Sequence, residues 1–283
     1  MHDKPSKAEM ITCLQKSGYL LEGRLVKALD ALGLLVEPSQ SLLDETTGVS
    51  REVDIVAESY RQATETPKIC VKTTFVIEAI NNIYPVVLLT RKLWTPNTPS
   101  DDYLHYKVTP SEDKPYHPFL DKLDLQQVQG VHRWEIYSQY CAFTRKKQND
   151  ELMASHPEDL HASIRKAVSY LFVSKDEYYG WMDNHPEDSY WRLFQWQALV
   201  VLQGDLYIMR EDERKKPDLV AVGVARLEYN FHHRGTPRTV IVNFVTESAL
   251  PQFVEEVLVH NETIETQIAA LRPSADTGEN TTA

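Results

Sequence analysis

The sequence predicts an α/β fold: a mixed central sheet flanked by helices, with additional strands and a helix towards the C-terminus. Stretches with apolar residues at helical spacing alternate with short β-branched runs. The composition, 42% hydrophobic and 25% charged over 283 residues, is that of a globular protein able to bury a full core. Because no repeat or linker divides the chain, we expect one domain over residues 1–271 and a disordered tail at 272–283. Within the domain we expect a core at about 17–150 and an elaboration at about 151–271.

The first long helix is expected from about residue 18 to 32, after a polar lead-in with a short helix over Glu9–Leu14. Ser17 suits its N-cap and Gly33 its C-terminal end. Its apolar stripe consists of Leu25, Val26, Leu29 and Leu32. Glu22 precedes these residues at helical spacing and therefore lies on the apolar face of the helix. For a lone glutamate a position at the border of the stripe is the simpler interpretation.

Strand-like runs follow, and two of them carry an acid in an apolar, β-branched setting. The runs are Leu34–Glu37, Glu52–Ala57, Ile69–Asn81 and Pro85–Thr90. Asp54 stands in VDIV and Glu78 in FVIEAI. A carboxylate there is costly to bury unless it has a partner, a proton or a metal. Two of them on consecutive strands predict a shared site, and we expect Glu22 to point into the same cleft.

The later elements are expected to alternate as well. Five prolines among irregular polar residues predict a long loop over 94–122. Helical spacing predicts helices over Leu123–Thr144 and Leu160–Phe172. The aromatic stretch 176–196 is able to stack on bases, but core packing is the favoured interpretation.

Strands and a last helix complete the chain. The strands are expected at Ala198–Met209, with a possible turn at Gly204-Asp205, and at Leu219–Tyr229 and Thr239–Thr246. A hairpin loop is expected at 230–238. The last helix, capped by Ser248, is expected to bury Phe253, Val257, Leu258, Ile264 and Ile268.

Charge and cysteine usage restrict the class of protein. The net charge of −11 and pI near 5.4 argue against a surface that is basic throughout, although they leave room for a local basic groove. Cys13, Cys70 and Cys141 are odd in number and form no CxxC pair, which indicates a reducing compartment. The N-terminus lacks a signal-peptide apolar core, and no run approaches membrane-spanning length. We therefore expect a cytoplasmic protein with no membrane partner.

Several common catalytic motifs are absent. The chain has no phosphate-binding glycine-rich loop, GxSxG elbow or HExxH motif. Basic clusters at 145–147, Arg165-Lys166 and 214–216 are able to touch phosphates, but solvated helix ends or turns are the simpler interpretation. The three acids are the signal that remains.

The order and spacing of the acids resemble those of the PD-(D/E)XK nuclease superfamily, also called restriction-endonuclease-like. That family has a glutamate on the first helix, an aspartate on the second strand, and a glutamate, one spacer and a lysine on the third. Glu22, Asp54 and Glu78 match the acids, and Asn81 follows as asparagine often follows the family lysine. The resemblance covers about residues 17–90 and implies a restriction-endonuclease-like core; the later elements match only in type.

One position departs from the family pattern. The family lysine, thought to position or activate the attacking water and to offset charge near the scissile phosphate, corresponds to Ile80. Lys72 is on the same strand face as Glu78 but lies about 20 Å along the strand. Lys27, on the first helix, is off the stripe that carries Glu22.

The resemblance implies a metal-dependent nuclease that hydrolyses phosphodiester bonds, with an altered active site. Asp54 and Glu78 would bind Mg²⁺ or Mn²⁺, and Glu22 would be a further ligand or would position water. The expected partner is nucleic acid, DNA rather than RNA. Ile80 and the negative charge favour an alternative, a catalytically inactive module of this fold that binds nucleic acid or a protein partner. A third interpretation is an α/β domain whose acids are ordinary surface or salt-bridge residues.

Overall fold

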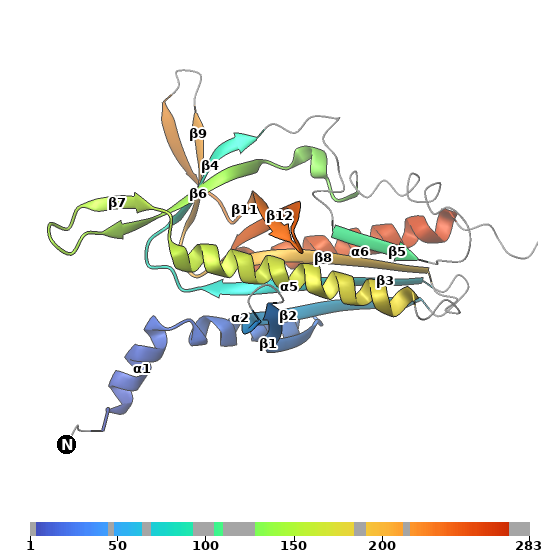
Figure 1. Cartoon of the computed structure of the whole chain (residues 1–283), viewed down its shortest axis with the longest axis horizontal. Helices are drawn as coiled ribbons and strands as arrows, with labels where there is room; N and C mark the ends of the chain where they lie inside the picture. The colour runs from blue at the N-terminus through green and yellow to red at the C-terminus, as the bar shows by residue number, and fades with distance from the viewer. Residues whose placement is uncertain are drawn as a thin grey trace, which may run out of the picture.

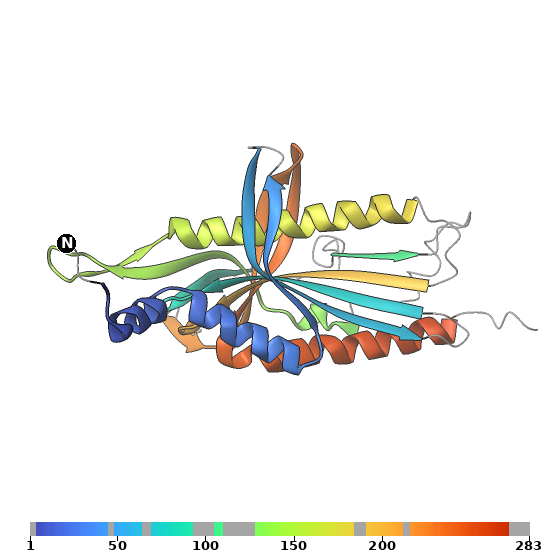
Figure 2. The same cartoon turned by 90° about the horizontal axis from the view of Figure 1, so that it is seen from below.

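The computed structural model describes residues 4–44, 48–63, 69–92, 105–109, 128–183, 191–211 and 216–271. Within these ranges one 12-stranded mixed sheet is flanked by helices on both faces, which confirms the predicted α/β class. Figures 1 and 2 show α5 along one face and α2 and α6 along the other. The helices are α1 (Lys7–Lys16), α2 (Tyr19–Ala31), α5 (Glu158–Asp183) and α6 (Leu250–Leu271), with 3₁₀ turns η2 (Val131–Arg133) and η3 (Glu247–Ala249).

The strands are β1 (Leu35–Asp44), β2 (Val49–Ala63), β3 (Ile69–Ile80), β4 (Val86–Lys92), β5 (His105–Thr109), β6 (Ile136–Arg145), β7 (Leu152–Ser155), β8 (Trp191–Leu202), β9 (Leu206–Glu211), β10 (Pro217–Ala221), β11 (Val224–His233) and β12 (Thr236–Thr246). Their order in the sheet is β1-β2-β3-β8-β12-β11-β6-β4-β9-β10, and β5 and β7 pair off this path with β8 and β6. The first three form an antiparallel meander, and β8 joins β3 in parallel. Strands from before and after residue 150 therefore alternate along the sheet.

Each face of the sheet carries its own hydrophobic core. On one face, α5 buries Leu160, Ile164, Val168 and Leu171 against strand residues such as Val76 and Val200. On the other, α2 buries Leu21, Leu25 and Leu29, and α6 buries Phe253 and Val254, against Phe75, Ile77 and Leu199. Alternate residues of β3 face opposite cores, because successive side chains of a strand leave the sheet on opposite sides.

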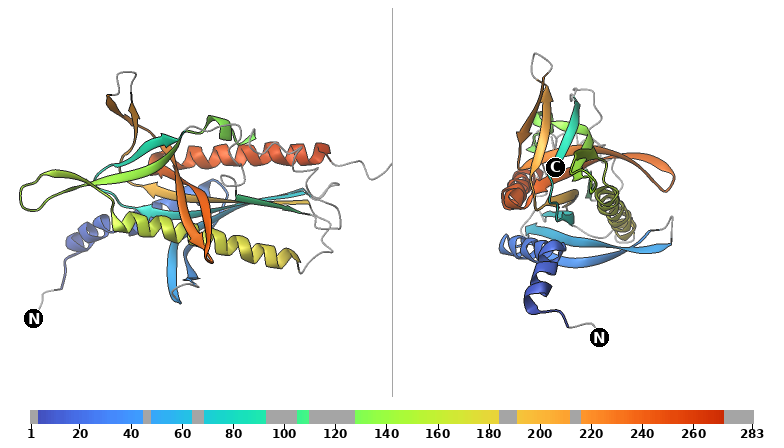
Figure 3. Two further views of the ribbon diagram at one scale, coloured as in Figure 1. Left: turned by 45° about the horizontal axis from the view of Figure 1, so that its top comes forward. Right: turned by 90° about the vertical axis from the view of Figure 1, so that its left-hand side faces the viewer.

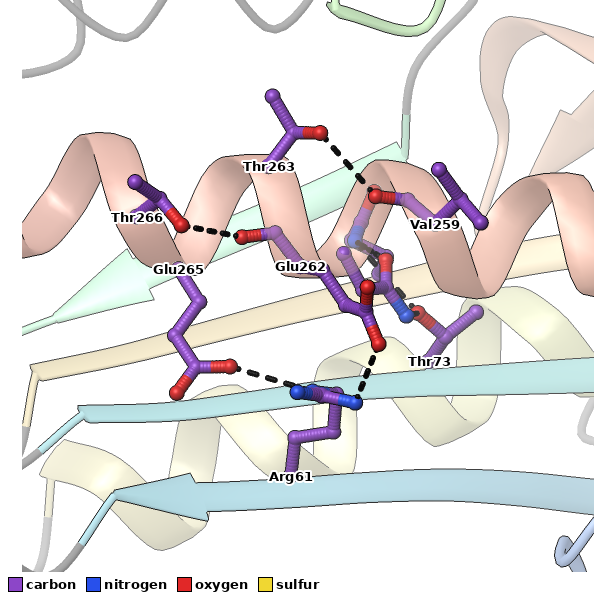
Figure 4. Close-up of polar contacts among 9 residues, drawn as sticks. Arg61, Thr73, Val259, Glu262, Thr263, Glu265 and Thr266 are labelled. Carbon is purple, nitrogen blue, oxygen red and sulfur yellow. Dashed lines mark hydrogen bonds and ion pairs between the residues drawn. The ribbon is translucent and has the colours of Figure 1, made fainter.

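Polar contacts also hold α6 against the meander. Arg61 on β2 forms ion pairs with Glu262 at 2.9 Å and Glu265 at 3.1 Å, as Figure 4 shows. Asn261 Nδ2 donates to Thr73 Oγ1 on β3 at 2.9 Å, and both side chains are buried. This satisfied hydrogen bond fixes the position of α6 along the sheet.

Two hairpins extend beyond the body of the sheet. The outer parts of β1–β2 and of β11–β12 reach past α5 on opposite sides of that helix (Figure 3, right). We call them the two hairpin arms. The β11–β12 arm turns at Arg234 and Gly235, both with positive φ, of 47° and 77°. The hairpin predicted at 230–238 is thus confirmed, with a shorter loop than expected.

Several predicted elements are confirmed and others are wrong. The helices expected at Glu9–Leu14, at 18–32, at Leu160–Phe172 and at the C-terminus are present as α1, α2, α5 and α6. The helix expected over Leu123–Thr144 is wrong, because its second half is strand β6, fixed in extended form by β4 and β11 on either side. Leu219–Tyr229 is two strands, β10 and β11, rather than one.

The expected loop over 94–122 contains strand β5, so that prediction is wrong at His105–Thr109; the remainder lies outside the described residues. The predicted tail at 272–283 and the side chain of Ile268 also lie outside them. Trp196 is 3% exposed and packs with Tyr178 and Phe194, as the core interpretation of the aromatic stretch predicts.

Candidate functional site

The ladder between β2 and β3 stops just before the two strand acids. The last paired residues are Ile55 and Ile77. Beyond them, the backbone N–H of Ala79 donates to Asp54 Oδ2 at 2.8 Å. A side chain therefore takes the place of a backbone carbonyl, and the two strands separate where both carry a carboxylate.

Glu78 is almost completely buried, with 1% of its surface exposed. It leaves β3 on the same side as Val76 and Ile80, towards the core beneath α5. A carboxylate buried to this extent needs a partner that offsets its charge, because buried polar atoms are nearly always paired.

A lysine from α5 supplies the opposite charge. Lys166 Nζ lies 2.7 Å from Glu78 Oε2 and 3.8 Å from Asp54 Oδ1. It also donates to the backbone carbonyl of Glu52 at 3.0 Å. Its long aliphatic stem lets the ammonium reach these groups from the edge of the apolar stripe of α5. We call Asp54, Glu78 and Lys166 the acid–lysine cluster.

The environment raises the pKa of Glu78 to about 7. Burial is the main cause, because it disfavours the charged form, and the nearby Asp54 charge adds to it. Hydrogen bonding and charge from Lys166, and a hydrogen bond from Ser163, act in the opposite direction. Ser163 and Lys166 are one turn apart on α5, so a single side of that helix stabilises the ionised form of Glu78.

Glu22 approaches the cluster from α2. Its pKa is raised by burial and then by the charges of Asp54 and Glu52, while Lys166 lowers it. A Cβ added at Gly18 would meet Glu22 Oε1 at 3.4 Å and the Ala79 carbonyl oxygen at 3.8 Å, which places the Glu22 carboxylate beside the end of β3. The three predicted acids therefore come from α2, β2 and β3 to one region.

The start of α2 is held against the end of β3 by an asparagine. Asn81 Nδ2 donates to the carbonyl oxygens of Gln15 at 3.1 Å and Ser17 at 3.2 Å. This residue directly follows β3, so the contact fixes the height at which Glu22 meets the strand.

The sequence-based candidates for the missing lysine are elsewhere. Ile80 is half-buried against the core beneath α5. Lys72 forms an ion pair with Glu58 at 2.7 Å and a hydrogen bond with Tyr178, and Lys27 is exposed on α2. In the sequence, Lys166 stands out only as part of the basic pair Arg165-Lys166. Its spacing of three residues from Ser163, on the flank of a predicted apolar stripe, is the signal that could have singled it out.

The spacing of the acids bears on whether the site is able to hold a metal ion. Within the part of the chain that the structure describes, no group of three or more His, Cys, Asp or Glu side chains is close enough together to hold a metal ion. Asp54 and Glu78 thus lie around Lys166, and Glu22 lies at the border of this cluster.

Comparisons with known proteins leave the site to be interpreted from its own geometry. No protein-family model, curated protein or solved structure matches the chain. Among the described residues, no helix is long and apolar enough to cross a membrane.

Proposed function

We propose that the chain is a metal-dependent nuclease of the PD-(D/E)XK type, in which Lys166 supplies the cation that position 80 lacks. The observation that carries this proposal is the contact of Lys166 Nζ with Glu78 at 2.7 Å and with Asp54 at 3.8 Å. The placement of the acids supports it: one on a helix before the first strand, one on the second strand and one on the third, as in the family pattern.

The donor atoms fit Mg²⁺ or Mn²⁺, the ions that the resemblance implies. Glu78 Oε2 contacts Lys166 Nζ at 2.7 Å and Ser163 also stabilises this carboxylate, while Asp54 Oδ1 has only the distant contact with Lys166. Carboxylate oxygens are the hard ligands that these ions prefer. A bound ion would polarise a phosphoryl oxygen and lower the pKa of a water molecule.

The chain's own residues have separate roles in this proposal. The Ala79 N–H holds the Asp54 carboxylate in one orientation. Lys166 favours the ionised form of Glu78, and its ammonium offsets negative charge on a phosphate oxygen. Glu22, at the border, is placed to orient water or to accept a proton, since burial and the neighbouring acids raise its pKa.

A second candidate is a catalytically inactive module of the same fold that binds nucleic acid. The spacing of the acids favours it, since no three metal-binding side chains gather within the described ranges. In that case the Lys166–Glu78 ion pair would serve only to neutralise a buried carboxylate.

Incubation of supercoiled plasmid and single-stranded RNA with Mg²⁺, Mn²⁺ or EDTA tests these candidates. We expect nicking of DNA with either ion, none with EDTA, and loss of nicking in Asp54→Asn and Glu78→Gln. Glu262→Gln, an exposed acid on α6, is the matched control and should cut as the wild type does. If the wild type cuts neither nucleic acid with either ion, the nuclease proposal is wrong and the inactive module is favoured.

A further inference from the structure

A groove lies between the two hairpin arms, on the outer side of α5. Its volume is about 540 Å³. The residues that line it are Leu42 and Leu43 of the β1–β2 arm, His161, Arg165, Ser169 and Val173 of α5, and Tyr229, Asn230, Phe231, His232, His233 and Arg234 of the β11–β12 arm. We call this the hairpin groove.

The lining has a charge opposite to that of the whole chain. It contains two arginines and no aspartate or glutamate, in a chain of net charge −11, although Asp176 pairs with one of the arginines from outside the lining. A local basic surface on an acidic protein selects an anionic ligand, because the remaining surface repels it.

Arg165 is the cation that α5 contributes to the groove. It is exposed and has no ion-pair or hydrogen-bond partner among the described residues. Its charge lowers the pKa of Tyr229 against the larger effect of burial, which places it near that ring. Arg234, on the β11–β12 arm, forms an ion pair with Asp176 at 2.8 Å, and half of its side chain is exposed. The groove thus presents one arginine from its floor and one from its wall.

Aromatic rings lie between the cations. Tyr229 and Phe231 are stacked, with ring centroids 6.2 Å apart and an interplanar angle of 18°. A basic groove with aromatic side chains is the arrangement that binds single strands, since phosphates contact the cations and unpaired bases stack on the rings.

The groove and the acid–lysine cluster share α5. Arg165 and Lys166 are consecutive and leave the helix in different directions, one into the groove and the other to Glu78. The two sites therefore lie beside the same turn of α5, on different sides of a helix about 10–12 Å wide. A strand in the groove is able to continue around α5 to the acids.

We propose that the hairpin groove binds single-stranded nucleic acid, with phosphates at Arg165 and Arg234 and a base against Tyr229 and Phe231. As a route for the strand to the acids, this inference rests on the proposed nuclease function; as a binding surface, it is tested separately.

The test is fluorescence anisotropy with a labelled oligothymidylate in EDTA, so that binding is measured without cleavage. Arg165→Ala and Arg234→Ala should each weaken binding about three- to tenfold and reduce the log–log salt slope by about 0.7. Arg145→Ala removes an arginine of similar exposure on the β6–β7 hairpin and should bind as the wild type does. Melting temperatures establish that each variant is folded.

Equal binding by the wild type and both groove variants would overturn the inference, as would an equal loss in Arg145→Ala. Tighter binding of a duplex than of the single strand would overturn the assignment to single strands. Asp54→Asn should retain binding in EDTA. Groove-dependent binding without cleavage would keep this inference and refute the nuclease; cleavage and binding unchanged in both groove variants would do the reverse.

Discussion

The Ala79 N–H and the Asp54 carboxylate are joined by a hydrogen bond of 2.8 Å at the point where β2 and β3 separate. This bond gives Asp54 a structural role in addition to its charge. A substitution that keeps the hydrogen-bond acceptor at position 54 and removes the negative charge separates the structural role of Asp54 from its electrostatic role.

Asp54→Asn should keep most of the stability and lose cleavage, because an amide oxygen still accepts from Ala79 but is a poorer metal ligand. Asp54→Ala should lose both, since a buried N–H without a partner costs about 1–3 kcal/mol. Urea unfolding measures the stability of each variant and plasmid nicking the activity. Equal destabilisation by the two substitutions would show that the hydrogen bond contributes little.

Lys166→Met should reduce Mg²⁺-dependent nicking about 100-fold or more, because it removes the only charge that stabilises ionised Glu78 within the acid–lysine cluster. Without that charge the pKa of Glu78 should rise further, and more of the carboxyl group is then protonated at neutral pH. Lys27→Met, an exposed lysine on α2, is the control. Full activity in Lys166→Met would exclude this lysine from catalysis.

The raised pKa of Glu78 predicts a pH-dependent stability. Because the pKa of Glu78 is higher in the folded state, protonation of this group stabilises the fold at low pH. This stabilisation is complete below the ordinary glutamate pKa of 4.5 and is lost as pH rises through about 7. The free energy of unfolding of the wild type should therefore fall relative to that of Glu78→Gln across this window, by on the order of 3 kcal/mol. Urea titrations at several pH values measure the difference; a constant difference would mean that the Glu78 pKa is ordinary.

The raised pKa of Glu78 predicts that activity increases with pH, whereas stability decreases with pH. Metal binding needs the carboxylate, so nicking by the wild type should rise with pH through about 7.

Position 80 provides a test of rescue. Ile80 leaves β3 on the same side as Glu78 and is only half-buried, so a lysine there has a route to the cluster. In the Lys166→Met background, Ile80→Lys should restore part of the nicking activity; in the wild type it should add little, because the cation is already present. Nicking rates of the two single variants and the double variant form the cycle. No rescue, together with a normal melting temperature in the double variant, would show that the strand position cannot replace Lys166.

The acids were predictable because their signal is local. Asp54 and Glu78 each stand in an apolar strand run, where a charge conflicts with its neighbours, and Glu22 stands on a helix stripe. Lys166 was not predictable in the same way, since a lysine at the edge of a helix stripe is normally solvated. Its role depends on which flank of α5 lies over β2, and that follows from the packing of the whole sheet.

Strand β6 shows the same limit. Ile136, Tyr140 and Phe143 recur at helical spacing, but Ile, Tyr and Phe are also strand-forming residues. Pairing with β4 and β11, distant in the sequence, decides between the two conformations. The division of the chain near residue 150 and the tail stay predictions.

The parallel pairing of β3 with β8 has a consequence for how the protein is made. Ile69 to Ile80 pair with residues 191–202, so this ladder cannot form on the ribosome until more than two thirds of the chain has been synthesised. Closing so long a loop is entropically costly and slows folding. Until α5 and β8 have been synthesised, β3 has no parallel neighbour and Glu78 has no Lys166 to offset its charge. The burial that raises the pKa of Glu78 is therefore a late product of synthesis, absent from any shorter nascent chain.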